Sequence, residues 1–274
     1  MQLMQRTPNS FVSLHINSTR QMLKFISFGS GSSGNCYFLY TENDGLLIDV
    51  GVGIRTLKKH FREYGLSLTQ IRRVLVTHDH ADHIKSVGSI SHDLHLPVYA
   101  TAVVHSGIDR NYCVTRKVDP ADRHLVESGK TVQLGDFLVT PFTVPHDSSD
   151  NVGYFLEAGN TTFCIITDAG MVTSEMAGYI NRAHYLVIEA NHDVEMLEQG
   201  SYPQHLKKRI LSGTGHLSNT DCGEAIVQNI ESCFHFHHSA LIIHQHVVNR
   251  IKISMKLLKV LIDVHRIVRL HGLI

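Results

Sequence analysis

The sequence lacks tryptophan, lacks any CxxC pair of cysteines, and lacks a long uninterrupted apolar run. Its five cysteines are scattered and odd in number, which argues against a disulfide framework or a structural zinc ribbon and predicts a reducing, cytoplasmic location. A membrane span needs about 18 consecutive apolar residues, and no run reaches that length. Residues 1–21 lack the apolar segment of a secretory signal, and we expect 1–22 to form a poorly ordered N-terminal extension.

An excess of charge of one sign is also missing, because 25 Lys and Arg residues balance 25 Asp and Glu residues. Net charge therefore neither indicates nor excludes a nucleic-acid partner. Histidine, in contrast, is abundant, with 21 residues in a chain of 274. Because histidine is the commonest metal ligand in proteins, this excess points to a metal centre.

The order of the apolar runs predicts an α/β protein. Helices are expected over 54–65, 83–95 and 218–230. Strands are expected over 23–28, 36–41, 46–50, 71–77, 97–101, 131–134, 137–144, 152–158, 161–168, 184–190 and 240–244. The strands come first in hairpins and then alternate with helices, so we expect an αββα sandwich of two packed mixed β-sheets with helices on the outer faces. No linker divides the chain, and 23–274 is expected to be a single domain.

The strongest chemical signal is the segment THDHADH at 77–83, which follows a buried-type strand. It contains His78, His80, Asp82 and His83, and imidazole and carboxylate groups suit Zn²⁺, Mn²⁺ or iron. On a turn, the first two histidines can bind one ion while Asp82 and His83 face a second, in a two-metal site with ions about 3.5–4 Å apart. A solvated loop is the alternative, and it is the better interpretation for an isolated HxH pair but not for this longer motif.

Three further candidates follow expected strands. His146 comes after FTVP, and Asp168 ends TTFCIITD. His244 ends ALIIH, with His246 two residues further on and facing the same way if the strand continues. Each has an ordinary alternative role in a loop or turn. Together with the HxHxDH segment they favour one shared metal site, in which the Asp168 carboxylate could bridge two cations.

Four weaker features are open to two interpretations each. Asp49 could accept a hydrogen bond from a ligand histidine or serve a turn. The glycine-serine loop at 30–35 could present N–H groups to an anion, but it does not match a P-loop. His192 could line the site or order its own loop. Small basic clusters such as 207–209 could contact phosphates, although such clusters are more often solvated faces.

These residues carry a family resemblance. The HxHxDH segment, followed by a lone histidine, an aspartate and a late histidine, resembles the metallo-β-lactamase fold superfamily. Within it, SFGSGSSGNCYFL, LLIDVG, VLVTHDHADHIKSV, IEANHDVEML and SGTGHLSN resemble the YycJ/WalJ-like hydrolases, described as 5′-to-3′ DNA exonucleases. The resemblance extends from about residue 23 to residue 230.

The resemblance implies two divalent metal ions per chain, Zn²⁺ or Mn²⁺, and DNA as the substrate. It assigns His78, His80 and His146 to one ion. The other ion would be held by Asp82, His83 and the late histidine, and Asp168 would bridge the two.

If two ions bind, a hydroxide held between them is the expected nucleophile that attacks the phosphodiester. Asp82 would orient this hydroxide. His216, just ahead of an expected helix, would donate a proton to the leaving oxygen or hold the phosphate. Alternatively, His216 makes only local hydrogen bonds at the start of that helix.

The C-terminal segment 232–274 departs from the family pattern. The family usually continues with a His-Leu-Ser and an acidic segment, whereas here HQHVVNRIKISMKLLKVLIDVHRIVRL follows the last strand. In this segment one acid, Asp263, stands against six Lys or Arg residues. Divergence and an altered reading frame both explain the change. His244 is taken as the last ligand because it ends the apolar run, with His246 as its substitute.

Two other functions stay open. The same fold and metals host many substrates, so hydrolysis of a small ester, thioester or lactam is one alternative. A non-catalytic metal-binding protein is the other, if the divergent C-terminal segment has lost the last ligand. The sequence does not determine the native metal, the polarity of digestion or the oligomeric state.

Overall fold

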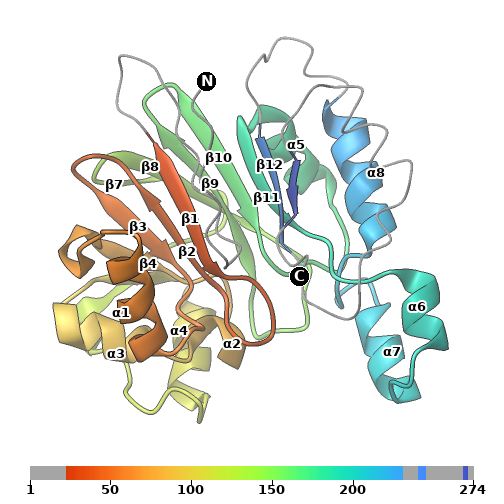
Figure 1. Cartoon of the computed structure of the whole chain (residues 1–274), viewed down its shortest axis with the longest axis horizontal. Coiled ribbons are helices and arrows are strands. Elements are labelled where there is room, and N and C mark those ends of the chain that lie inside the picture. The colour runs from red at the N-terminus through yellow and green to blue at the C-terminus, as the bar shows by residue number, and fades with distance from the viewer. Residues whose placement is uncertain (1–22, 231–239, 245–267, 271–274) are drawn as a thin grey trace.

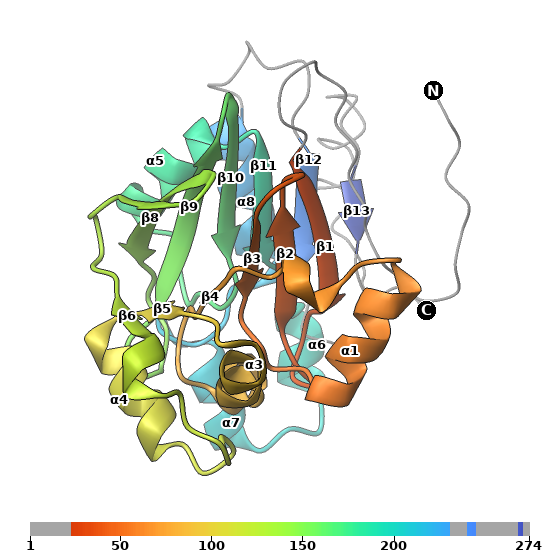
Figure 2. The same cartoon turned by 90° about the vertical axis from the view of Figure 1, so that its left-hand side faces the viewer.

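The computed structural model describes residues 23–230, 240–244 and 268–270. The predicted N-terminal extension 1–22 and most of the segment 232–274 lie outside the described residues. Two β-sheets pack together, and helices cover their outer faces (Figures 1 and 2). This arrangement confirms the predicted αββα sandwich. No helix within the described ranges is long and apolar enough to cross a membrane.

Within the described ranges the first sheet has six strands and is mixed. Its first three strands pair antiparallel, and the following strands pair in parallel. In spatial order the strands are β1 (Lys24–Gly29), β2 (Cys36–Tyr40), β3 (Gly45–Ile48), β4 (Arg73–Leu75), β5 (Val98–Ala100) and β6 (Arg123–Leu125).

The second sheet has seven strands among the described residues and is also mixed. The four strands that come first in the chain pair antiparallel, and the remaining ones pair in parallel. In spatial order the strands are β13 (Val268–Leu270), β12 (Ala240–His244), β11 (Tyr185–Glu189), β10 (Thr161–Ile166), β9 (Val152–Ala158), β8 (Phe137–Thr143) and β7 (Val132–Leu134).

The alternation of side chains along each strand produces the layers. Phe25 of β1 and Phe163 of β10 both face the space between the sheets, where their ring centroids lie 4.9 Å apart. Their chain neighbours Ile26 and Cys164 face outward and pack against helices. Because both faces of the central strands are buried, their sequences are apolar almost throughout.

Helices cover the two outer faces separately (Figure 1). The first sheet is covered by α1 (Ile54–Glu63), α2 (Ala81–Ile84), α3 (Val87–Leu94) and α4 (Ala102–Arg110). The second sheet is covered by α5 (Ser174–Arg182) and α8 (Asn219–Ile230), and α6 (Val194–Gln199) and α7 (Gln204–Ile210) lie between them in the chain. Short 3-10 turns occur at Leu68–Gln70 and Pro120–Asp122.

The structure differs from the sequence prediction in the helical segments. The prediction of a single helix over 83–95 is wrong, because α2 and α3 are separate helices. The main chain of Val50 explains the break: its N–H donates to His83 O, and Ser86 N–H donates to Val50 O. Six further elements were not predicted from the sequence, namely α4, α5, α6, α7, β6 and β13.

Candidate metal centre

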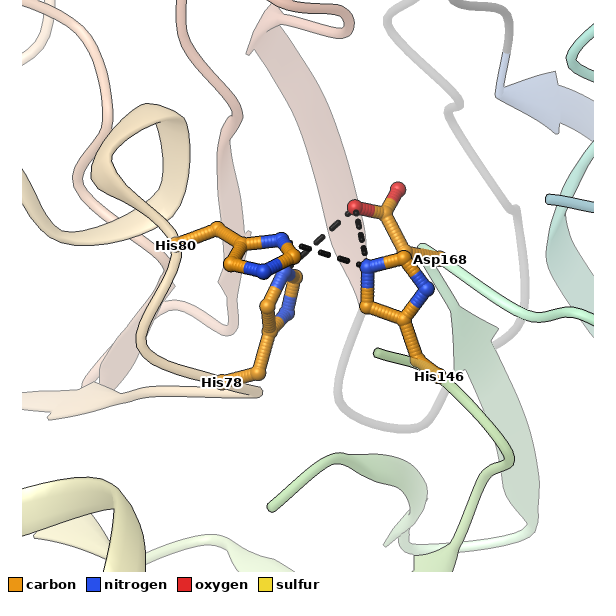
Figure 3. A group of neighbouring side chains, drawn as sticks. All are labelled: His78, His80, His146 and Asp168. Atoms are coloured by element: carbon orange, nitrogen blue, oxygen red, sulfur yellow. Dashed lines mark hydrogen bonds and ion pairs between the residues drawn. The ribbon is translucent and has the colours of Figure 1, made fainter. Parts of the chain in front are cut away.

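Four side chains from three loops converge on one point (Figure 3). His78 and His80 come from the loop after β4, His146 from the loop after β8, and Asp168 from the loop after β10. Their ligand atoms all lie within 4.8 Å of one another. The structure therefore brings together four residues that the sequence predicts as metal ligands.

Hydrogen bonds between the two sheets place these loops against each other. Tyr154 of β9 donates its O–H to Val76 O, 2.7 Å away, at the end of β4. The main chain of His78 pairs with that of Asn151. Asn151 in turn donates its side-chain N–H to Asp168 O at 2.8 Å. These contacts hold the histidines of the first sheet opposite the aspartate of the second.

In His78 and His146, a contact at Nδ1 orients the ring so that Nε2 faces the other ligand atoms. His146 Nδ1 donates to Gly215 O at 2.8 Å, and His78 Nδ1 lies 3.0 Å from Thr77 Oγ1. His78 Nε2 is buried and makes no hydrogen bond within the described residues. A buried nitrogen without a hydrogen bond is costly, and ligation of a metal ion would satisfy it.

The spacing of the facing atoms suits a tetrahedral ion. His80 Nδ1 lies 3.2 Å from His146 Nε2, and Asp168 Oδ2 lies 3.4 Å from His78 Nε2 and 3.6 Å from His146 Nε2. Ligands held by Zn²⁺ at about 2.0–2.1 Å in a tetrahedron stand about 3.4 Å apart. The residues present therefore fit Zn²⁺, and Mn²⁺ accepts the same donor types.

A second group of ligand atoms shares the same aspartate. His83 Nε2 lies 3.2 Å from Asp168 Oδ2 and 3.9 Å from Asp82 Oδ2. His83 Nδ1 lies 2.7 Å from Asp49 Oδ2, which confirms the predicted contact of Asp49 with a histidine of the motif. Asp49 also adopts a left-handed φ of 56°, so it serves a turn as well. One oxygen of Asp168 thus faces both groups, as a bridging carboxylate requires.

The glycine-serine loop at 30–35 supports the second group through Asn35, which sequence reasoning did not single out. Gly31 N–H donates to Asn35 Oδ1 at 2.7 Å and thereby turns Asn35 Nδ2 toward His83 Nε2 at 2.7 Å and Asp82 Oδ2 at 3.4 Å. The N–H groups of Gly31, Gly34 and Asn35 all donate to oxygens of the fold. These three groups therefore do not form the anion nest that the sequence allowed.

Burial and neighbouring charges shift the pKa values of the clustered histidines in opposite directions. Burial and the charge of His83 hold the pKa of His78 well below its ordinary value. Burial also lowers the pKa of His83, but Asp168 and Asp49 outweigh it and raise that pKa well above the ordinary value. Burial and His146 lower the pKa of His80. A neutral imidazole is the form that binds a metal ion, so His78 and His80 are in the ligating state near neutral pH.

His216 lies beside the metal centre and pairs with Glu189, a residue that sequence reasoning missed. His216 Nδ1 lies 2.8 Å from Glu189 Oε1, and the His216 ring centroid lies 5.0 Å from that of His146. Burial lowers the pKa of His216, but the hydrogen bond and charge of Glu189 outweigh it and raise the pKa to about 9. Atoms of Asp168, Glu189 and His216 also lie within 4.8 Å of one another. The imidazolium form that predominates near neutral pH can donate a proton.

The structure tests the predicted roles of His244 and His192 only in part. The main chain of His244 pairs with that of Glu189 in the parallel register of β11 and β12, which places His244 at the sheet edge that carries the site. Its role as the last ligand stays a prediction, and His246 lies outside the described residues. The main-chain oxygen of the buried His192 accepts the N–H of Asn219 at the start of α8, whereas neither ring nitrogen makes a hydrogen bond within the described residues, so the role of the His192 side chain stays a prediction.

Comparison with known proteins agrees with this geometry. The family described as the beta-lactamase superfamily domain matches residues 45–238. The exodeoxyribonuclease WalJ of Streptococcus pneumoniae is 37% identical over 207 residues, which cover 76% of this chain and 77% of that protein. The exodeoxyribonuclease YycJ of Bacillus anthracis is 34% identical over 208 residues, which cover 76% of this chain and 78% of that protein.

A solved structure shows the same fold. Zn²⁺-bound PqqB from Methylobacterium extorquens superposes with a TM-score of 0.67 and 18% sequence identity, covering 91% of this chain and 98% of that one. At this low identity the similarity establishes the architecture and not the reaction.

Proposed function

The chain belongs to the metallo-β-lactamase superfamily, and we propose that within it this protein is a metal-dependent phosphodiesterase, a 5′-to-3′ DNA exonuclease. The observation that carries the proposal is the shared carboxylate oxygen of Asp168, which lies 3.4 Å from His78 Nε2 and 3.2 Å from His83 Nε2. Two relatives named exodeoxyribonucleases, each aligned over 76% of this chain, support DNA as the substrate.

His78, His80, His146 and Asp168 would hold one divalent ion, Zn²⁺ or Mn²⁺. Asp82, His83, Asp168 and a late histidine, His244 or His246, would hold the other. When bound, such ions lower the pKa of coordinated water to about 7 and neutralise charge on a phosphoryl group.

Side chains of this protein orient the attacking water and protonate the leaving oxygen. Asp82, whose carboxylate is 24% exposed beside His83, accepts a hydrogen bond from the attacking water and orients it. Glu189 accepts the Nδ1–H of His216 at 2.8 Å, so the proton for the leaving 3′ oxygen is carried on Nε2. A serine or cysteine nucleophile is not required, because the attacking group is water.

A reducing cytoplasm is the compartment that we propose. The four cysteines in the described part of the chain, Cys36, Cys113, Cys164 and Cys222, are all free. Burial raises the pKa of Cys36, Cys164 and Cys222, which keeps these thiols protonated and unreactive.

End-labelled DNA tests the proposed function directly. We expect metal-loaded protein to release labelled mononucleotides at once from a 5′-labelled single strand, and to give a ladder of shortening products from a 3′-labelled one. A chromogenic ester and a chromogenic lactam, incubated in parallel, test the alternative substrates. EDTA-treated protein is the control for a contaminating metal-independent nuclease. Release of no nucleotide with either Zn²⁺ or Mn²⁺ would exclude the nuclease.

A further inference from the structure

Arg209 is a cation at the edge of the metal centre that the proposed reaction does not use. It lies in the last turn of α7, and its side chain is 48% exposed. Its Nε–H and Nη2–H groups both donate to the carboxylate of Asp147, the Nη2 atom at 2.9 Å. Asp147 directly follows His146, and its Oδ1 lies 3.5 Å from His146 Nε2 and 3.9 Å from His80 Nε2. One carboxylate therefore links the guanidinium to two predicted ligands.

Contacts made by its neighbours fix the end of α7 that carries this arginine. The main chain beyond α7 turns back on the helix, where His216 N–H donates to Ile210 O at 3.0 Å. Lys207, two residues before Arg209, is buried and donates its Nζ to Glu198 O at 2.7 Å. Asp147, and more weakly Asp168 and Asp82, raise the pKa of Arg209, because their negative charges stabilise the guanidinium cation. The guanidinium is thus held at a defined position rather than on a freely solvated face.

The guanidinium retains capacity for a second anion. An arginine has five N–H donors in a planar fork, and the pair with Asp147 uses two of them. The others match the oxygens of a phosphate, which arginine binds in a bidentate manner. The bound ions would act on the scissile phosphate, whereas the phosphates that flank it meet the carboxylates around the site, and a cation at its edge offsets that repulsion.

We propose that Arg209 binds the DNA phosphate next to the scissile phosphodiester and that Asp147 positions the Arg209 guanidinium. This inference rests on the proposed function. This contact makes the site prefer a polynucleotide over a diester with a single phosphate. A clamp role, in which Arg209 only holds the loop of His146, is the competing explanation. The two differ because a clamp affects every substrate equally.

Arg209→Ala is therefore compared on a single-stranded oligonucleotide and on bis(p-nitrophenyl) phosphate, which has one phosphate. We expect the variant to lose about 10- to 100-fold more kcat/KM on DNA than on the small diester, mainly through a higher KM. We also expect the slope of log kcat/KM against log salt to become shallower by about 0.7, the value for one phosphate contact on a single strand. Arg209→Lys should recover part of the loss, because it keeps the charge without the fork.

Arg123→Ala is the matched control. Arg123 forms a similar two-pronged pair with Asp109, at 2.6 and 2.9 Å, but lies on β6, which β5 separates from β4 in the first sheet. This variant should leave both activities and the salt slope unchanged. Equal losses of Arg209→Ala on both substrates with an unchanged salt slope would overturn the assignment and leave the nuclease standing. Failure of the unaltered protein to cleave DNA would instead remove the proposed function and this inference with it.

Discussion

Asp168→Ala is expected to abolish DNA hydrolysis, with a loss of at least about a thousandfold in kcat, because both of the proposed ions would share this carboxylate. Its Oδ2 lies 3.2 to 3.6 Å from nitrogens of His78, His83 and His146. The fold should survive, since the Asn151 side chain bonds the main-chain oxygen of Asp168, which alanine retains. His80→Ala should have the same effect on turnover and leave the fold intact, because its side chain is 29% exposed and not part of the buried core.

Turnover of end-labelled DNA and the thermal unfolding midpoint by circular dichroism check this prediction together. Asp93→Ala is the matched control, because Asp93 is a partly exposed aspartate on α3 that pairs with Lys58 and Arg116. It should keep turnover within about twofold of the unaltered protein, as expected for a surface change. Retained activity in Asp168→Ala or in His80→Ala refutes the assignment of the centre.

His216→Ala is expected to lower kcat on DNA by about 10²- to 10⁴-fold, the usual contribution of a general acid. The 3′ oxygen of a nucleotide leaves poorly without a proton, whereas p-nitrophenolate leaves readily without one. The same variant should therefore lose much less kcat on bis(p-nitrophenyl) phosphate. The measured quantity is the fold-loss in kcat on DNA divided by the fold-loss in kcat on bis(p-nitrophenyl) phosphate.

His205→Ala controls for removal of a histidine near the site. His205 is exposed on α7, four residues before Arg209, and we expect no change on either substrate. If His216→Ala loses equally on both substrates, His216 supports the metal centre through its contact with His146 and does not transfer the proton.

The metal motif could be predicted because its residues are adjacent in the sequence and follow a readable strand. His78, His80, Asp82 and His83 lie in one loop, so no knowledge of the fold is needed to group them. The strands were readable for a related reason, since their apolar runs are bounded by glycine, aspartate and other turn residues.

Glu189 was missed because its partner is far away in the sequence. It follows the apolar run YLVI and resembles an ordinary strand end. Its importance arises from the parallel pairing of β10 with β11, in which Ile166 is opposite Ile188. That register brings Glu189 to the edge where Asp168 lies, and two strands of a sheet do not reveal their mutual register in the sequence.

The basic cluster at 207–209 shows the same limit. Its three cations are neighbours in the sequence, but Lys207 is buried against Glu198 while Arg209 pairs with Asp147. A solvated face is therefore the wrong description of Lys207, while Arg209 is half exposed and paired. Charge type alone does not distinguish these surroundings, because each is created by a segment distant in the chain.

The central claim is that this fold holds two metal ions on either side of one aspartate. A crystal structure of the metal-loaded protein, with anomalous diffraction at the zinc or manganese edge, tests it most directly. Two anomalous peaks that flank the Asp168 carboxylate, one beside His78, His80 and His146 and one beside His83 and Asp82, are the predicted result. A single peak, or an Asp168 or His146 side chain directed away from the metal, would contradict the account.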